Sequence, residues 1–115
     1  MKDDKIFLKH ILDEIEFLQT KSDTLSYDQL ISDRDIEHAI TRALEIIGEA
    51  SKNVSLEIRE KYPSVPWKDI AGMRDRIIHG YFSINYEIVY DVVKRKIPEI
   101  EPVIRTVLSN LERET

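Results

Sequence analysis

The stretch from residue 33 to 54 reads DRDIEHAITRALEIIGEASKNV and has the most regular pattern in the chain. Its apolar residues recur three or four positions apart, at Ile36, Ile40, Ala43, Ile47, Ala50 and Val54. This spacing is typical of a helix with one buried stripe. Small residues near the stripe would let a second backbone come close, namely Ala39, Ala43, Gly48 and Ala50. We expect Ser32 to cap the helix, because a serine hydroxyl can accept a hydrogen bond from its first turn.

The rest of the chain is also predicted to be helical, because it has three glycines, four prolines and no Asn-Gly or Asp-Gly hairpin turn. The expected helices lie at about residues 4–20, 33–54, 55–61, 67–78 and 85–111. A polar loop is expected over 20–27, fraying at Gly80, a cap at Asn85, and a break or kink at Pro98. We therefore predict an all-α protein, an antiparallel bundle of four to five helices in one domain spanning 1–115.

Composition excludes several classes of protein. The chain has 115 residues, of which 42% are hydrophobic and 34% charged, a balance typical of globular proteins. It has no cysteine, which excludes disulfides, thiolate catalysis and zinc–cysteine sites. No apolar run reaches the ~18 residues of a membrane helix, and the N-terminus lacks a secretory signal, so we expect a cytoplasmic protein without membrane contact. A net charge of −5 argues against tight nonspecific binding to nucleic acid, yet allows a local cationic site.

Chemically active side chains gather at residues 74–81, which read RDRIIHGY. This segment supplies two guanidinium groups (Arg74 and Arg76), an imidazole (His79) and a phenol (Tyr81). An imidazole can move protons near pH 7, and a guanidinium can hold a phosphate through two parallel hydrogen bonds. Together these groups can bind or cleave a phosphodiester without a metal.

The spacing of these residues also fits a structural role. Arg74 could form a surface ion pair, and His79 could cap a carbonyl at a helix end. Residues five apart lie about 140° from each other around a helix, so the two side chains do not share a face. They can meet on one phosphate if the helix loosens near His79, which Gly80 would permit, or if a second subunit completes the site. The spacing leaves both arrangements open.

Two carboxylates on the central helix are further candidates. Glu45 and Glu49 lie four residues apart, so both face the same side of the helix. Such a pair usually forms a solvated face. The alternative is that Glu49 orients Arg74 or His79 from the neighbouring helix.

Other conspicuous residues have simpler interpretations. We expect His10 at the edge of the core, His38 on a charged helical face, and Trp67 as a packing anchor at a helix start. The histidines show no spacing that predicts a metal site, and no His-x-x-x-His pair occurs. No metal or other cofactor is therefore expected.

Several separated blocks of the chain agree with one known family. In order along the sequence they are IIGEA at 46–50, YP at 62–63, PW at 66–67, GMRD at 72–75, HGY at 79–81 and IPEI at 97–100. In this order and at these distances the blocks resemble the HepT-like proteins of the HEPN (higher eukaryotes and prokaryotes nucleotide-binding) superfamily. The resemblance covers about residues 5–111.

The resemblance implies an all-α bundle that forms a two-fold homodimer. It implies the toxin of a type VII-like toxin–antitoxin system, whose antitoxin is an MntA-type nucleotidyltransferase. Such toxins are metal-independent ribonucleases, and their Arg-x4-His-x-Tyr motif falls on Arg74, His79 and Tyr81. Asp75 follows the arginine, where the family often has asparagine. The antitoxin silences the toxin by AMPylation of the motif tyrosine, here Tyr81.

RNA is thus the expected substrate, with Arg74 and His79 catalytic and with Asp75, Glu49 and Arg76 supporting them. Two other functions stay open at this point. The chain could be a non-catalytic, nucleotide-binding partner of a nucleotidyltransferase, or a substrate-binding subunit for nucleotidyl transfer to small molecules. The sequence does not distinguish tRNA from mRNA as a target.

Overall fold

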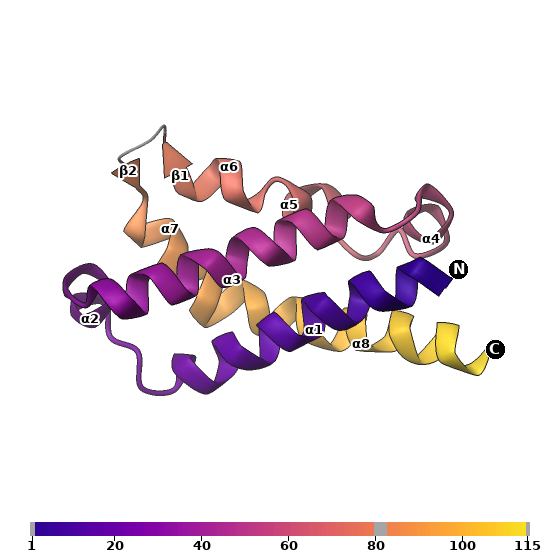
Figure 1. Cartoon of the computed structure of the whole chain (residues 1–115), viewed down its shortest axis with the longest axis horizontal. Coiled ribbons are helices and arrows are strands. Elements are labelled where there is room, and N and C mark those ends of the chain that lie inside the picture. Colours follow the sequence, from indigo (N-terminus) through magenta and orange to yellow (C-terminus); the bar gives the residue numbers. More distant parts are fainter. Residues whose placement is uncertain (1, 80–82, 115) are drawn as a thin grey trace.

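The stretch at 33–54 forms α3 (Arg34–Asn53), which is the central helix of the bundle in Figure 1. The computed structural model describes residues 2–79 and 83–114, with the backbone alone at residues 2, 78, 79 and 83. The other elements are α1 (Lys2–Ser22), α2 (Tyr27–Ser32), α4 (Leu56–Lys61), α5 (Trp67–Ala71), α6 (Met73–Ile77), β1 (Ile78–His79), β2 (Ser83–Ile84), α7 (Tyr86–Asp91), the π-helical segment η1 (Val92–Lys96) and α8 (Ile97–Arg113). The predicted all-α bundle is confirmed. A short antiparallel pair, β1 with β2, was not predicted.

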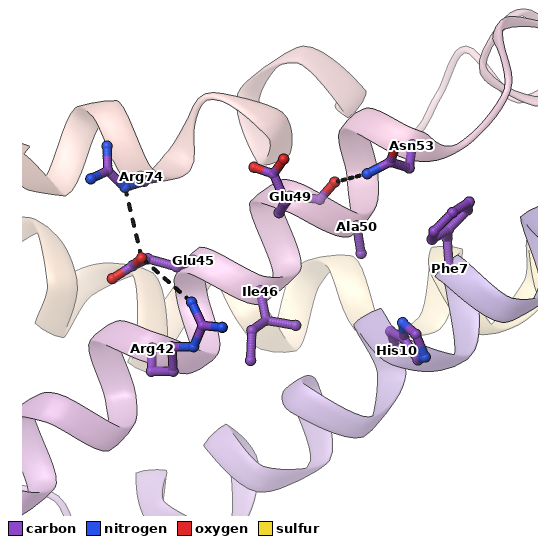
Figure 2. Close-up of a pocket in the computed structure, with 9 residues that line it drawn as sticks. All are labelled: Phe7, His10, Arg42, Glu45, Ile46, Glu49, Ala50, Asn53 and Arg74. Carbon is purple, nitrogen blue, oxygen red and sulfur yellow. Dashed lines mark hydrogen bonds and ion pairs between the residues drawn. The ribbon is translucent and has the colours of Figure 1, made fainter.

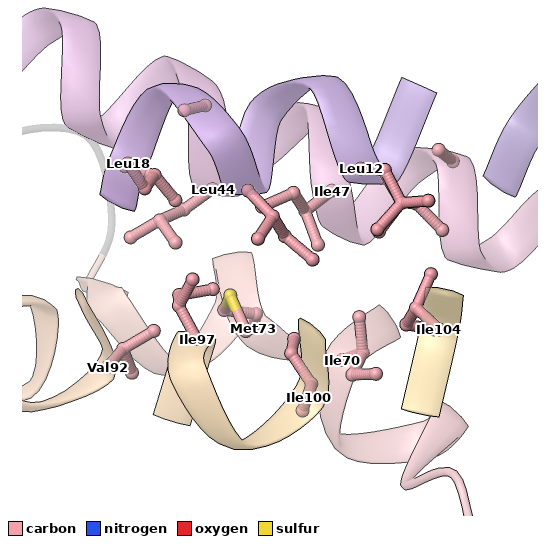
Figure 3. Close-up of a cluster of buried hydrophobic side chains, with 14 of the residues drawn as sticks. Leu12, Leu18, Leu44, Ile47, Ile70, Met73, Val92, Ile97, Ile100 and Ile104 are labelled. Atoms are coloured by element: carbon pink, nitrogen blue, oxygen red, sulfur yellow. The ribbon is translucent and has the colours of Figure 1, made fainter. Parts of the chain in front are cut away.

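The long helices bury their apolar stripes against one another. α3 contacts α1, α2, α5 and α6, while α8 packs along α1 on the other side of the core. Figure 3 shows Leu44 of α3 facing Ile97 of α8 across the core and Leu12 of α1 facing Ile104, and all four are buried. The predicted apolar stripe is buried from Ile40 to Val54, and Ile36 at its start is partly buried against the core.

A close backbone approach sets the position of α5. A Cβ atom at Gly48 would lie 3.3 Å from the carbonyl oxygen of Ile70, which is tighter than ordinary van der Waals contact. The small residue therefore lets α5 lie directly against α3, as the small-residue pattern predicted. This contact matters for function because α6, which carries Arg74, follows α5 after Gly72.

Several helix boundaries differ from the expected ones. Asp33 caps α3 by accepting a hydrogen bond from the Ile36 N–H, whereas the expected cap, Ser32, ends α2 and donates its hydroxyl to the Asp28 carbonyl. The expected loop over 20–27 is shorter, because α1 extends to its third residue and α2 begins at its last. The helix expected over 67–78 is split in two, at a glycine, which is a poor helix former.

The caps of α4 and α7 and the position of Pro98 lie closer to where the sequence predicted them. Ser55 and Asn85 cap α4 and α7 by accepting hydrogen bonds from the N–H groups of Ile58 and Ile88. Pro98 stands in the first turn of α8, directly after η1, and has no N–H to donate to the preceding helical turn. The expected break before it takes the form of the π-helical turn η1.

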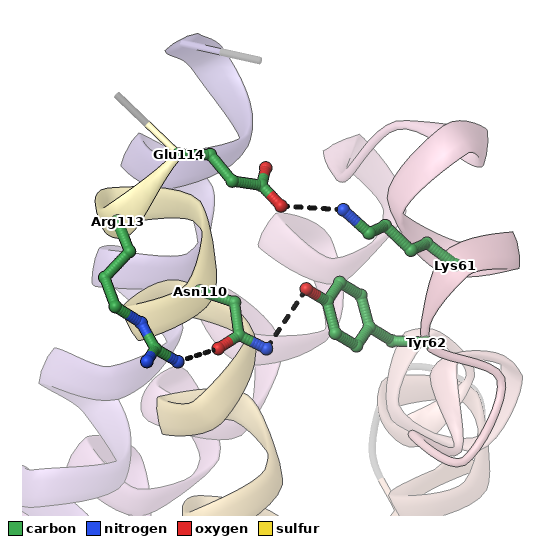
Figure 4. A network of polar contacts seen from close by, with 5 residues as sticks. All are labelled: Lys61, Tyr62, Asn110, Arg113 and Glu114. Atoms are coloured by element: carbon green, nitrogen blue, oxygen red, sulfur yellow. Dashed lines mark hydrogen bonds and ion pairs between the residues drawn. The ribbon is translucent and has the colours of Figure 1, made fainter.

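A cluster of polar contacts joins the C-terminal turn of α8 to the end of α4 (Figure 4). The Asn110 amide donates to the Tyr62 hydroxyl over 3.2 Å, and Lys61 Nζ lies 2.8 Å from Glu114 Oε1. The Tyr62 carbonyl in turn accepts a hydrogen bond of 3.0 Å from the indole N–H of Trp67. The start of α5 is therefore fastened to the end of α8.

A buried carboxylate joins the start of α1 to the start of α4. Asp4 is only 2% exposed, and its two oxygens accept hydrogen bonds of 2.7 and 2.8 Å from the backbone N–H and the hydroxyl of Ser55.

No helix among residues 2–79 and 83–114 is long and apolar enough to cross a membrane.

Replacing Asp4 with alanine should lower the free energy of unfolding by about 1–3 kcal/mol, because the N–H of Ser55 is then left without its acceptor. Urea denaturation followed by circular dichroism would measure the change. Asp3→Ala is the matched control, since Asp3 lies in the same helical turn but is exposed. Equal stability of the two variants would show that the hydrogen bonds of Asp4 to Ser55 do not stabilise the fold.

Candidate functional site

The segment at 74–81 begins on α6 and continues into β1, which pairs with β2. Arg74, Asp75 and Arg76 lie on α6, and all three are exposed. The helix ends at Ile77, so His79 lies in β1, where its backbone is paired with that of Ser83.

The helix therefore ends before His79, as the first of the two arrangements requires. The meeting of Arg74 and His79 on one phosphate stays a prediction. The expected fraying point, Gly80, and the motif tyrosine, Tyr81, lie outside the described residues. Completion of the site by a second subunit stays a prediction.

Local sequence explains why the helix stops there. Ile77 and Ile78 are β-branched, which favours extended backbone over helix, and Ile77 is fully buried. Across the base of the hairpin, the Asn85 N–H donates to the Ile77 carbonyl over 2.7 Å. The Asn85 side chain then caps α7, so one residue closes the hairpin and starts the next helix.

Arg74 lines a pocket of about 410 Å³, together with residues of α1 and α3 (Figure 2). Its Nε atom lies 3.8 Å from Oε2 of Glu45, and its Nη1 atom lies 3.9 Å from Oδ1 of Asp75. The same Glu45 oxygen is 3.8 Å from Nη1 of Arg42. One carboxylate of α3 is thus shared by two guanidinium groups.

Glu49, the carboxylate that sequence reasoning put forward, lines the same pocket one turn farther along α3. Its side chain is exposed and has no ion pair within the described residues, and its carbonyl accepts a hydrogen bond from the Asn53 amide. The structure therefore brings Arg74 to Glu45. In the sequence, Glu45 is paired with Glu49 at i,i+4 and with Arg42 at i,i+3, and neither spacing says anything about Arg74.

The structure confirms the expected positions of Trp67 and His38 and corrects that of His10. Trp67 is buried, and His38 is exposed beside Glu37, with 3.6 Å between Nε2 and the carboxylate. His10 is exposed and lines the Arg74 pocket, where its ring meets the edge of Phe7. The core-edge prediction for His10 is therefore wrong, because the residue faces outward from α1 while Phe7 packs against the core.

Arg76 belongs to a different surface from Arg74. It lines a second pocket, of about 380 Å³, together with Lys96 and with residues of α5 and α8. Residues two apart lie about 200° from each other around a helix, which sends the two arginine side chains to opposite sides of α6. The structure does not bring them together.

Tyr86, the first residue of α7, lies near the Glu37 carboxylate of α3. Burial raises the pKa of the Tyr86 hydroxyl, and the neighbouring Glu37 carboxylate raises it further, because both disfavour the phenolate. The phenol therefore stays protonated at neutral pH and can donate to Glu37.

The fold and site define a small helical protein with an arginine at a pocket and a histidine just beyond the end of its helix. The chain belongs to the HepT-like family, because the family model described as Ribonuclease HepT-like matches residues 11–107. No solved structure gives a significant match.

Three relatives match over most of their length. A protein of Caldanaerobacter subterraneus subsp. tengcongensis, named Putative RNase TTE0752, is 45% identical over 108 residues, which are 94% of this chain and 96% of that one. Putative RNase MJ1216 of Methanocaldococcus jannaschii is 39% identical over 111 residues, covering 96% and 92%. Probable ribonuclease HepT of Thermococcus cleftensis is 35% identical over 97 residues, covering 84% and 88%.

Proposed function

We propose that this protein is a metal-independent endoribonuclease in which Arg74 and His79 carry out the chemistry. The observation that supports this most strongly is the intact Arg-x4-His-x-Tyr motif in a chain of the HepT-like ribonuclease family. Relatives of nearly the same length are named as RNases, which agrees with RNA as the substrate.

RNA carries its own nucleophile, the ribose 2′-OH, so the protein needs only to move protons and stabilise charge. His79 would take the 2′-OH proton or give one to the leaving 5′-oxygen. Arg74 would hold the non-bridging oxygens as negative charge develops on them. In a two-fold dimer, two histidines would meet, one as base and one as acid. Asp75, Glu49 and Arg76 are the further residues proposed to support the site.

The proposal is tested with purified wild-type protein and a labelled single-stranded RNA. Cleavage should be unchanged in EDTA, and attack by the 2′-OH should leave a 2′,3′-cyclic phosphate on the product. The same oligonucleotide made as DNA is the control, because it lacks the nucleophile. Loss of cleavage in EDTA, or equal cleavage of the DNA, would contradict the mechanism.

We further propose that the protein is the toxin of a type VII-like toxin–antitoxin pair in the cytoplasm. An MntA-type nucleotidyltransferase would silence it by AMPylation of Tyr81. An AMP group there would place a phosphate two residues from His79, where it would repel the RNA backbone and fill the site. A chain that accepts AMP but never cleaves RNA would instead support a non-catalytic role as a partner of the nucleotidyltransferase.

Tyr81→Phe should abolish silencing, because phenylalanine has no hydroxyl to accept AMP. Cells that express this variant together with the nucleotidyltransferase should stop growing, whereas cells with the wild-type pair should grow. Mass spectrometry of the purified proteins should find one added AMP on wild type and on the control Tyr90→Phe, and none on Tyr81→Phe. Silencing of a Tyr81→Phe protein that is toxic alone would show that another residue is modified.

A further inference from the structure

The carboxylate of Glu45 lies between two guanidinium groups that come from different helices. Its Oε2 atom is 3.8 Å from Nε of Arg74 on α6 and 3.8 Å from Nη1 of Arg42 on α3. Figure 2 shows both arginine side chains directed to the Glu45 carboxylate from opposite sides. We propose that Glu45 is a positioning residue that holds Arg74 for catalysis, with Arg42 bracing the carboxylate. The inference rests on the proposed ribonuclease function.

Burial makes Glu45 better suited to this task than the other acids near Arg74. The Glu45 side chain is 29% exposed, whereas that of Asp75 is 79% exposed. Ion pairs in open water are weak because solvent screens them, and partial burial reduces that screening. Glu49 is exposed and has no ion pair with Arg74.

The helices that carry Glu45 and Arg74 differ in length and packing, so Glu45 can hold Arg74 in position. Glu45 lies in the middle of α3, a helix of 20 residues that is packed on several sides. Arg74 lies on α6, which has only 5 residues and is exposed along this face. An unrestrained arginine side chain carries about 2 kcal/mol of rotamer entropy. A carboxylate on the longer helix can therefore restrict the Arg74 side chain before RNA binds.

The Arg74 guanidinium is also open to substrate. Its side chain is 53% exposed, and its nearest approaches to the two carboxylates are 3.8 Å from Nε to Glu45 and 3.9 Å from Nη1 to Asp75. Its N–H groups can therefore donate to a phosphate oxygen. Because this contact matters most as charge develops on the phosphate, losing its orientation should lower kcat more than it raises KM.

The primary test is Glu45→Gln, which removes the charge and keeps the size of the side chain. We expect kcat for RNA cleavage to fall roughly 10-fold, with KM changed by less than about 2-fold. Glu60→Gln is the matched control, since Glu60 is an exposed glutamate on α4. Glu45→Asp should recover part of the lost activity. Thermal unfolding of each variant shows whether it is folded.

A double-mutant cycle shows whether Glu45 acts through Arg74. In an Arg74→Lys background, Glu45→Gln should lower kcat by far less than 10-fold, because the Nε–H that Glu45 orients is gone. An equal cost in both backgrounds would overturn the inference, and so would a Glu45→Gln enzyme as active as Glu60→Gln. A larger loss from Glu49→Gln than from Glu45→Gln would return the role to Glu49.

Two further measurements test the inference if Glu45→Gln does not fold or if the wild-type protein does not cleave RNA. Should Glu45→Gln not fold, Arg42→Ala should lower kcat in the same direction by a smaller factor, and no loss would overturn the bracing role. The Nε–H NMR signal of Arg74 should shift in Glu45→Gln and not in Glu60→Gln, and an unmoved signal would overturn the inference without reference to catalysis. An inactive wild-type protein with a shifted signal would instead refute the proposed ribonuclease function alone.

Discussion

His79→Ala is expected to lower the rate of RNA cleavage by about 10²–10⁴-fold, the usual contribution of a positioned general acid or base. Alanine removes the only group in the motif that can both accept and donate a proton near pH 7. The backbone of His79 is paired in β1, and a β-strand pair depends on main-chain atoms, so the substitution should leave the hairpin in place. Single-turnover cleavage with enzyme in excess would measure the chemical step.

His38→Ala is the matched control for this experiment. His38 is exposed on α3, contacts Glu37 and takes no part in the motif. Its variant should cleave RNA at the wild-type rate. If His79→Ala also stayed within a few-fold of wild type, the histidine would have no role in proton transfer and the proposed mechanism would fail.

Trp67→Ala is expected to lower the free energy of unfolding by about 3–5 kcal/mol, the usual cost of truncating a buried aromatic residue. The indole is buried, and its N–H donates to the carbonyl of Tyr62. Tyr62 is itself held by Asn110 of α8 (Figure 4). The indole therefore joins the start of α5 to the C-terminal helix. Loss of this anchor should loosen α5 and, with it, α6 and Arg74.

Urea denaturation followed by circular dichroism is the right measurement, because Trp67 is the sole tryptophan and its removal abolishes the fluorescence signal. Trp67→Phe keeps an apolar ring while losing the hydrogen bond, so it should cost clearly less than alanine. If the two variants were equally stable, the buried ring would not be the anchor. Cleavage by folded Trp67→Ala at low temperature should still be reduced, since α6 depends on α5 for its position.

Periodicity predicted the helices that have a strong apolar stripe or an evident cap. α3 and α4 lie where the sequence placed them, and Asn85 caps α7 as expected. The short elements were missed. α2 has six residues and one buried side chain, too few for a periodic signal, and β1 and β2 have two residues each and no turn dipeptide that predicts a hairpin.

The sequence by itself determined the class of fold, the family and the motif at residues 74–81. These follow from helical spacing and from blocks of residues whose order survives in the linear chain. Only the tertiary structure decided that the helix ends before His79 and that Arg74 contacts Glu45 instead of Glu49. Both carboxylates face the same side of α3, and the choice between them depends on where α5 and α6 dock along that helix. That position is set by the close approach at Gly48 and by the anchor at Trp67, which are contacts between segments far apart in the chain.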